Sequence, residues 1–226
     1  MSSKSAQRAR ARELAAQYIE KRDPTGWFEP LYREARSGRV TIPWADGMPN
    51  PNLTEFWAQK NIAIPIGAAV VIGCGLGDDA EWLSQRGFAT TAFDISPSAV
   101  GGARERFPKS NVHYVVADLL NPPGEWIGQF DFVLESYTLQ VLPSSLRRQA
   151  AKRIADLTRP GRLALVITRA RDEADPPGEM PWPLTRRDLD QIAAAGLTEI
   201  SFEDYYDSES PRVRRFRALF EKTVYR

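Results

Sequence analysis

Three glycines and two aspartates lie at spacings that could hold a small polar ligand. Gly73, Gly75 and Gly77 follow a short apolar run, Asp94 ends the next run, and Asp118 ends a third. A glycine turn after a strand lets the backbone approach a ligand closely, and an acid ending the next strand can accept hydrogen bonds from both hydroxyls of a ribose. Asp118, which ends the third run, could meet an adenine edge. Together these residues predict a site for a nucleoside-containing ligand.

The residues that follow the glycine turn indicate the charge of that ligand. A dinucleotide fingerprint would need a third glycine at position 78, but the chain has Asp78 there, followed by Asp79. Two adjacent acids suit the start of a helix but would repel a pyrophosphate. The pattern therefore favours a cofactor with positive groups and no phosphate, such as S-adenosylmethionine, over a nicotinamide dinucleotide.

Alternating strand and helix signals must position these residues. Five runs rich in β-branched and aromatic residues are predicted as buried strands, at 68–73, 90–95, 112–119, 130–136 and 162–168. Helical periodicity between them covers 78–87, 97–107 and 143–161. Strict alternation predicts right-handed crossovers and a doubly wound parallel sheet, with ligands beyond the carboxyl ends of its strands.

The ends of the chain depart from that alternation. A helix with Thr185 as its N-cap is predicted over 184–196, followed by two consecutive strands at 197–208 and 214–225. Helical spacing in the first 22 residues predicts an N-terminal helix lying on the domain. A second short helix is expected from Pro24, after an Asp23 cap, to Gly38.

These motifs resemble the class I S-adenosylmethionine-dependent methyltransferases, from about Ala68 to the C-terminus. VIGCGLGDD resembles the first motif of that family, FDIS the second, VVADLL the adenine motif, FDFVLES the fourth strand and RPGRLALVI the fifth. The resemblance implies a Rossmann-like α/β fold with a seven-stranded, mostly parallel sheet whose final pair includes one antiparallel strand. It also implies S-adenosylmethionine as the cofactor.

The predicted cofactor-binding residues come from the ends of successive strands and from one upstream tryptophan. They are Gly73, Cys74, Gly75, Gly77, Asp94, Ile95, Asp118, Leu119, Glu135 and Trp44. No metal ligand is expected.

The upstream segment points to one branch of this family. IPWADGMPNPNLTEFW resembles the PW-x-x-G-x-x-x-P segment of the thiopurine and halide or thiol methyltransferases, and EWLSQRG is similar to their first crossover helix. Those relatives usually have an acid directly after Pro-Trp, where this chain has Ala45, with Asp46 one residue later.

The expected reaction is methyl transfer to a small acceptor, most simply a thiol, a sulfide or another soft nucleophile. In-line displacement at a sulfonium depends on alignment and desolvation, and no evident His or Cys base ends a strand. Glu135 and Tyr137 could take a proton or line the pocket, and with Trp44 they are the candidate catalytic residues. Small-molecule O- or N-methylation and a non-catalytic methyltransferase-like binding protein remain alternatives. Asn121-Pro122-Pro123 resembles an amine methyltransferase motif but follows the third strand, so it is predicted as a turn.

Two proline-rich segments are expected to cover the site. They span 43–51, with Trp44, and 171–183, with Trp182. Residues 1–60 are accordingly predicted to form N-terminal helices and a lid segment, and 61–226 the S-adenosylmethionine-binding domain.

Four further residues could have either a functional or a structural role. Arg169 and Arg171, just beyond the fifth strand, could hold an anionic acceptor or be solvated. Cys74 could be a nucleophile, but direct methyl transfer needs none, so small-residue packing is expected. His113 begins a predicted strand and is expected to be structural rather than a base.

Composition excludes several classes of partner. The 226 residues carry 30 Lys and Arg against 29 Asp and Glu, so no global field recruits nucleic acid or an anionic membrane. Cys74 is the one cysteine, which excludes an internal disulfide and suits a reducing compartment. With no apolar stretch of membrane-spanning length, the protein is expected in the cytoplasm. The oligomeric state is left open.

Overall fold

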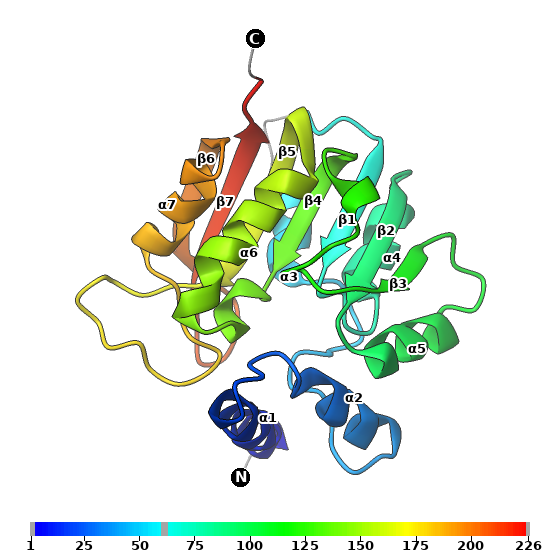
Figure 1. The fold of residues 1–226 in the computed structure, drawn as a ribbon, viewed down its shortest axis with the longest axis vertical. Coiled ribbons are helices and arrows are strands. Elements are labelled where there is room, and N and C mark those ends of the chain that lie inside the picture. Colours follow the sequence, from blue (N-terminus) through cyan, green and yellow to red (C-terminus); the bar gives the residue numbers. More distant parts are fainter. Residues whose placement is uncertain (1–2, 60–62, 225–226) are drawn as a thin grey trace.

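The computed structural model describes residues 3–59 and 63–224, which form one seven-stranded sheet with helices on both faces (Figure 1). The strands are β1 (Ala68–Ile72), β2 (Ala89–Asp94), β3 (His113–Val116), β4 (Phe130–Ser136), β5 (Thr158–Arg169), β6 (Leu197–Tyr206) and β7 (Arg214–Lys222). The helices are α1 (Ser3–Glu20), α2 (Phe28–Arg36), α3 (Pro51–Gln59), α4 (Asp78–Ser84), α5 (Pro97–Arg106), α6 (Ser144–Leu157) and α7 (Arg186–Ala194).

The strand order β3-β2-β1-β4-β5-β7-β6 confirms the predicted doubly wound sheet. β1 pairs in parallel with β2 and with β4, whereas β7 lies antiparallel between β5 and β6. The direction of winding reverses between β1 and β4, where Ile72 lies opposite Glu135. The glycine turn after β1 and the segment after β4 therefore leave the sheet side by side, where such sheets bind ligands.

Side chains on the two faces of the sheet fill two separate apolar clusters. In β4, Val133 packs toward α6 and α7, while Phe132 and Leu134 pack toward α4 and α5 on the other face. All three are fully buried, which is why this central strand is a continuous apolar run. Each cluster fixes one layer of helices against the sheet.

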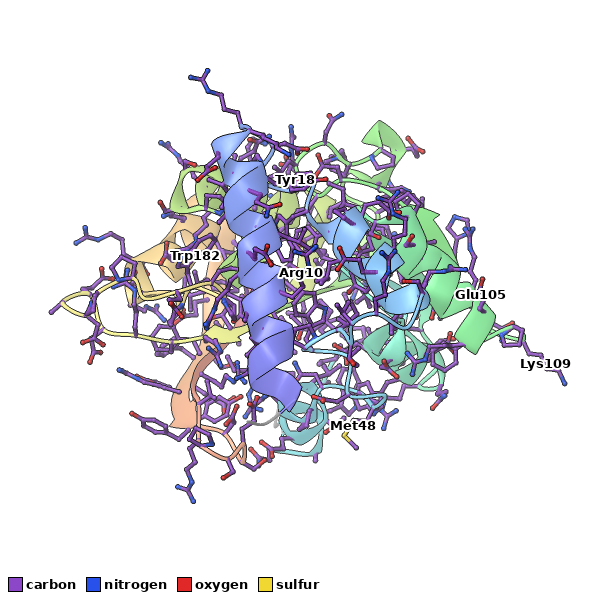
Figure 2. The ribbon with its side chains drawn as sticks, turned by 90° about the horizontal axis from the view of Figure 1, so that it is seen from below. Arg10, Tyr18, Met48, Glu105, Lys109 and Trp182 are labelled. Carbon is purple, nitrogen blue, oxygen red and sulfur yellow. The ribbon has the colours of Figure 1, made fainter. Side chains whose placement is uncertain are left out.

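A third apolar cluster lies beyond the carboxyl ends of the parallel strands, where α1 and α2 cross below the sheet in Figure 1. Trp27 and Leu31 are fully buried there with Leu14 of α1, and they meet Val141 and Met180 from the later half of the chain. Figure 2, seen from below, shows α1 crossing this end of the molecule with Trp182 to one side. The N-terminal segment thus covers the ligand-binding edge.

The predicted N-terminal boundaries need two corrections. The second helix begins at Phe28 instead of Pro24, because the Asp23 carboxylate accepts the Gly26 N–H at 3.0 Å in a turn that precedes it. The sequence reasoning also missed α3, which begins at Pro51 inside the proline-rich segment and buries Leu53 and Phe56. Proline at the first helical position was the available signal.

The C-terminal elements agree with the sequence. Thr185 caps α7, and its hydroxyl accepts the Asp188 N–H while the Asp188 carboxylate accepts the Thr185 N–H. The two strands that follow are consecutive and antiparallel, as expected. Among the described residues, no helix has the length and apolar character needed to cross a membrane.

Candidate functional site

A cavity of about 490 Å³ opens at the carboxyl ends of the parallel strands, under the N-terminal segment. The turns after β1, β2, β3 and β4 form its floor, and residues 43–52, here called the strap, form part of its roof. Residues near the ends of β5 and β7 close one side. Its place coincides with the site predicted from the glycines and acids.

The glycine turn has a backbone that side chains would not allow. Gly73 and Gly75 have φ angles of +60° and +52°, and a Cβ on Gly75 would lie 2.9 Å from the Tyr32 hydroxyl. The Cys74 N–H donates to the Phe93 carbonyl at 2.8 Å, which ties the turn to β2. The turn therefore presents bare backbone to the cavity.

Two acids face the cavity from the strand ends beside this turn. Asp94 Oδ2 accepts the Gly75 N–H at 3.0 Å and its Oδ1 accepts the Ser96 N–H at 2.9 Å. Burial raises the pKa of Asp94 to about 6. Asp118 Oδ1 accepts the Leu120 N–H at 2.9 Å. Each carboxylate keeps lone pairs with which it can accept hydrogen bonds from a ligand.

The structure places most of the predicted cofactor residues around this cavity. Gly77 and Glu135 are the exceptions, since neither lines it. The predicted residues that do are Gly73, Cys74, Gly75, Asp94, Ile95, Asp118, Leu119 and Trp44.

The adjacent acids after the turn are engaged with protein groups. Arg106 donates to both carboxylate oxygens of Asp78, at 2.8 and 2.9 Å. Asp79 accepts the Asn50 N–H at 2.7 Å, and burial raises its pKa to about 6. The first acid is thus balanced by an arginine, and the second anchors the strap.

Asn50 joins the strap to two strand ends, and sequence reasoning missed it. Besides its N–H bond to Asp79, its side-chain Nδ2 donates to the Ser136 hydroxyl at 2.7 Å. Its Oδ1 accepts the Asn52 N–H at 2.9 Å and the Tyr137 hydroxyl at 3.3 Å. An asparagine between two prolines was the only signal, since prolines leave few local partners for its side chain.

Trp44 lines the cavity from the strap and is 38% exposed. Its indole N–H donates to the Tyr32 hydroxyl at 2.9 Å, and its ring packs edge-on against Trp27. From the second proline-rich segment, Met180 and Pro181 line the cavity. Trp182 does not line it. Its ring packs in the N-terminal apolar cluster instead.

The two candidate proton acceptors have different surroundings. Glu135 is fully buried, and its Oε1 accepts the N–H groups of Thr138 and Leu139 at 2.7 and 2.9 Å. Its Oε2 has no hydrogen-bond partner among the residues that the structure describes. Burial raises its pKa to about 7. Tyr137 lines the cavity with a left-handed backbone, φ +68°, and burial raises the pKa of its phenol. Tyr137 can therefore touch a ligand as a neutral hydroxyl, and Glu135 supports the loop beneath it.

Charged side chains gather at the side of the cavity formed by β5 and β7. Arg215 donates to Asp207 at 2.7 Å and to Glu209 at 2.6 Å, and Arg8 lies 3.8 Å from Glu209. Arg169 lines the same side. Arg171 lies outside the cavity and donates to main-chain carbonyls.

Two residues with alternative readings have no reactive geometry. His113 is exposed on β3 and does not line the cavity. Burial raises the pKa of the Cys74 thiol well above its usual range, so the thiol stays protonated. Among residues 3–59 and 63–224, no three His, Cys, Asp or Glu side chains form a group that could hold a metal.

The chain is similar to known methyltransferases. Residues 69–161 match the family described as methyltransferase domain. The chain is 27% identical over 173 residues to 2-heptyl-1-hydroxyquinolin-4(1H)-one methyltransferase of Mycobacteroides abscessus, covering 74% of each chain. It is 23% identical over 199 residues to thiopurine S-methyltransferase of Vibrio atlanticus, covering 78% of this chain and 87% of the relative.

Solved structures share the fold. One, from work on the conversion of a disulfide bond into a thioacetal group during echinomycin biosynthesis, has a TM-score of 0.71 at 23% identity and covers 88% of this chain and 91% of its own. Another is the Burkholderia thailandensis 1,6-didemethyltoxoflavin-N1-methyltransferase with bound S-adenosylhomocysteine, with a TM-score of 0.65 at 20% identity, covering 87% and 86%.

The buried Glu135 carboxyl predicts a pH dependence of stability. Its folded pKa of about 7 lies above the unfolded value, so the folded state binds the proton more tightly and stability falls as pH rises between the two values. We expect Glu135→Gln to reduce this fall by on the order of 2 kcal/mol between about pH 5 and about pH 8. Some slope remains, because Asp79 and Asp94 titrate in the same window.

Urea unfolding at the two pH values measures this effect. Glu125→Gln, at an exposed glutamate, is the matched control and should keep the wild-type slope. Equal slopes for the two variants would show that Glu135 is ionised without cost in the folded protein.

Proposed function

We propose an acceptor class for this chain, which belongs to the class I S-adenosylmethionine-dependent methyltransferases and to their thiopurine methyltransferase-like branch. The chain is an enzyme that methylates a small molecule with S-adenosylmethionine as cofactor. We infer that the methyl group goes to a soft, easily ionised nucleophile, most simply a thiol or sulfide.

The residues around the glycine turn fit this cofactor. Asp94 accepts the ribose hydroxyls in our proposal, and Asp118 meets the adenine edge. Ile95 and Leu119 supply apolar contacts to the base. When bound, the cofactor supplies an electrophilic methyl group on a positively charged sulfur. The pKa of Asp94 is near 6, so the carboxylate is ionised at neutral pH and suits a cofactor that carries positive groups.

The pairing of the acids near Tyr137 is the observation that carries the acceptor assignment. Asp207 and Glu209 both accept from Arg215, and the pKa of Asp207 is held below its ordinary value despite burial, by hydrogen bonds including that of Arg215. The Asp207 carboxylate, held in this way, is a weak base. Tyr137 is protonated and can only donate or accept a hydrogen bond as a neutral group. An acceptor that ionises readily by itself suits such a site, and the thiopurine S-methyltransferase relative supports it.

Alignment and exclusion of water then provide the catalysis. Trp44 on the strap and Met180 on the second proline-rich segment line the cavity from opposite ends of the chain. Their apolar surfaces hold the acceptor against the methyl group and keep water from the nucleophile. Glu135 acts in this proposal as a positioning residue, because its carboxyl fixes the N–H groups of Thr138 and Leu139 beneath the cavity.

A second candidate acceptor is an acidic hydroxyl on a heteroaromatic ring. The Mycobacteroides abscessus relative is named for a 1-hydroxyquinolinone, and it matches 74% of this chain. Such a hydroxyl, like an aryl thiol, ionises without a strong protein base. This is the property that the present site would require of its acceptor.

An acceptor panel tests the proposal directly. We expect transfer from methyl-labelled cofactor to an aryl thiol to exceed transfer to hydrogen sulfide, iodide, a catechol or an amine, with a 1-hydroxyquinolinone as the comparison for the second candidate. Preference for the catechol or the amine over every soft acceptor would overturn the acceptor class and leave methyl transfer intact. Preference for the hydroxyquinolinone would replace the first candidate by the second.

Asp94→Asn tests the cofactor site. We expect S-adenosylhomocysteine to bind more weakly by about 1.5 to 3 kcal/mol in isothermal titration calorimetry, because charge-assisted hydrogen bonds to the ribose are lost. Asp190→Asn, at an exposed acid on α7, should bind as the wild type does. Unchanged affinity in a folded Asp94→Asn protein would remove the ribose assignment.

Trp44→Ala tests the roof. We expect kcat to fall on the order of tenfold to a hundredfold, because an open site readmits water and loosens alignment. Trp44→Phe keeps an aromatic ring over the cavity and loses only the hydrogen bond to Tyr32, so it should retain most of the turnover. Full activity of Trp44→Ala, measured at saturating cofactor and acceptor, would mean that the strap does not close over the reacting atoms.

A further inference from the structure

We propose that the acceptor carries a carboxylate in addition to its nucleophile, and that Arg169 binds it. This inference deepens the proposed function and rests on it for the position of the acceptor. It follows from where Arg169 lies, what surrounds it and how its main chain is fixed.

The position of Arg169 separates it from the cofactor. The proposed cofactor contacts follow β1, β2 and β3, whereas Arg169 ends β5 and Arg215 lies in β7. β4 lies between these two groups in the sheet, and Tyr137 follows it. A ligand that reaches Arg169 from the cofactor must therefore pass Tyr137, which places Arg169 on the far side of the reacting atoms.

Charge at this side of the cavity is unbalanced. Three arginines line it, Arg8, Arg169 and Arg215, against the two acids Asp207 and Glu209. Both acids are bonded to Arg215, and Glu209 also lies near Arg8. In the part of the chain that the structure describes, the Arg169 side chain has neither a hydrogen bond nor an ion pair. Its guanidinium is a half-buried cation that no acid of the described residues contacts directly, and Glu209 acts on it only at longer range.

Neighbouring cations make that unbalanced charge costly. Arg169 and Arg215 lie directly opposite each other in the antiparallel pairing of β5 with β7. Like charges in such a pair destabilise a sheet. Arg215 is held by its two acids and by contact with the Tyr137 ring, 4.6 Å from guanidinium to ring centre. Asp207 and Glu209 balance the charge of Arg215 but not that of Arg169. An anion bound to Arg169 would reduce the remaining repulsion between the two arginines.

The main chain of Arg169 is fixed, so the side chain starts from a defined place. Its N–H donates to Gln140 Oε1 at 2.7 Å, and its carbonyl accepts the Leu184 N–H at 2.9 Å. Gln140 is itself buried and lines the cavity. From this fixed main chain, the arginine side chain carries a planar guanidinium whose N–H groups can donate two parallel hydrogen bonds to one carboxylate.

Apolar side chains elsewhere on the cavity wall indicate the rest of the ligand. Phe28, Leu142 and Met180 line the same cavity. An aromatic or other apolar body between the nucleophile and the carboxylate fits this combination. Mercaptobenzoate has these three parts, so 3-mercaptobenzoate is the probe, and thiophenol is the matched compound without the carboxylate.

The kinetic test compares these two thiols in the wild type, Arg169→Gln and Arg169→Lys. We expect Arg169→Gln to raise KM for 3-mercaptobenzoate at least tenfold, with a small effect on its kcat and on both constants for thiophenol. The KM of Arg169→Lys for 3-mercaptobenzoate should lie between those of the wild type and Arg169→Gln, because lysine keeps the positive charge but not the planar set of N–H donors. Arg171→Gln, outside the cavity, should match the wild type. An equal effect on both thiols would place Arg169 at the reacting sulfur and overturn the proposal.

A binding test keeps the inference separate from the acceptor assignment. With S-adenosylhomocysteine present, 3-(methylthio)benzoate should bind the wild type more tightly than thioanisole does, and Arg169→Gln should abolish that difference in calorimetry. This holds even for an enzyme that transfers its methyl group to oxygen or nitrogen. Affinity of Arg169→Gln for S-adenosylhomocysteine alone should be unchanged. A tenfold loss there would assign Arg169 to the cofactor carboxylate, and no difference between the two ligands in the wild type would also overturn the proposal.

Discussion

The hydrogen bonds of Asn50 are the interaction on which the closed site depends. Its main chain bonds to Asp79 after β1, and its side chain bonds to Ser136 and Tyr137 after β4. These two strands are where the winding of the sheet reverses, so one residue spans the opening that every such sheet leaves at this edge. On the same strap, Trp44 donates to the hydroxyl of Tyr32, which is buried in the apolar cluster that α1 and α2 form with later parts of the chain. Asn52, also on the strap, adds a second attachment after β4, since its Nδ2 donates to the Tyr137 hydroxyl at 2.8 Å.

The sequence predicted those parts of the protein whose signals are local. Alternating apolar runs identified the strands, and Thr185 identified the start of α7, because caps and periodicity act within a few residues. The glycine turn, Asp94 and Asp118 were predicted to meet because carboxyl ends of parallel strands share one edge. Asn50, the pairing of Asp78 with Arg106 and the position of Met180 in place of Trp182 depend on contacts between distant segments. Such contacts leave no periodic pattern in one sequence. The start of α3 was missed because Pro51 ends a proline-rich segment that suggested a loop.

Burial explains why similar carboxyls have different roles here. Desolvation raises the pKa of Glu135, Asp79 and Asp94, although each carboxyl also accepts backbone N–H hydrogen bonds that favour its ionised form. Asp207 receives the same kind of bonds and an arginine as well, and its pKa is lowered. The balance between burial and donors therefore differs from acid to acid. It leaves Asp207, which Arg215 holds, poor at accepting a proton, whereas the buried Glu135 carboxyl beneath the cavity binds one more readily than an ordinary glutamate does.

The two halves of the cavity come from separate stretches of the chain. Turns and strand ends between residues 72 and 120 form one half, and the other half includes Arg8, Arg169, Met180, Asp207, Ser208, Glu209 and Arg215. The first set belongs to the crossovers that build the sheet, whereas much of the second lies on loops and strand ends that the sheet tolerates in many forms. Substitution in the second set can thus reshape that part of the cavity without disturbing the crossovers. For protein engineering, the cavity therefore has one half whose shape the sheet itself dictates and another whose shape can be changed one side chain at a time.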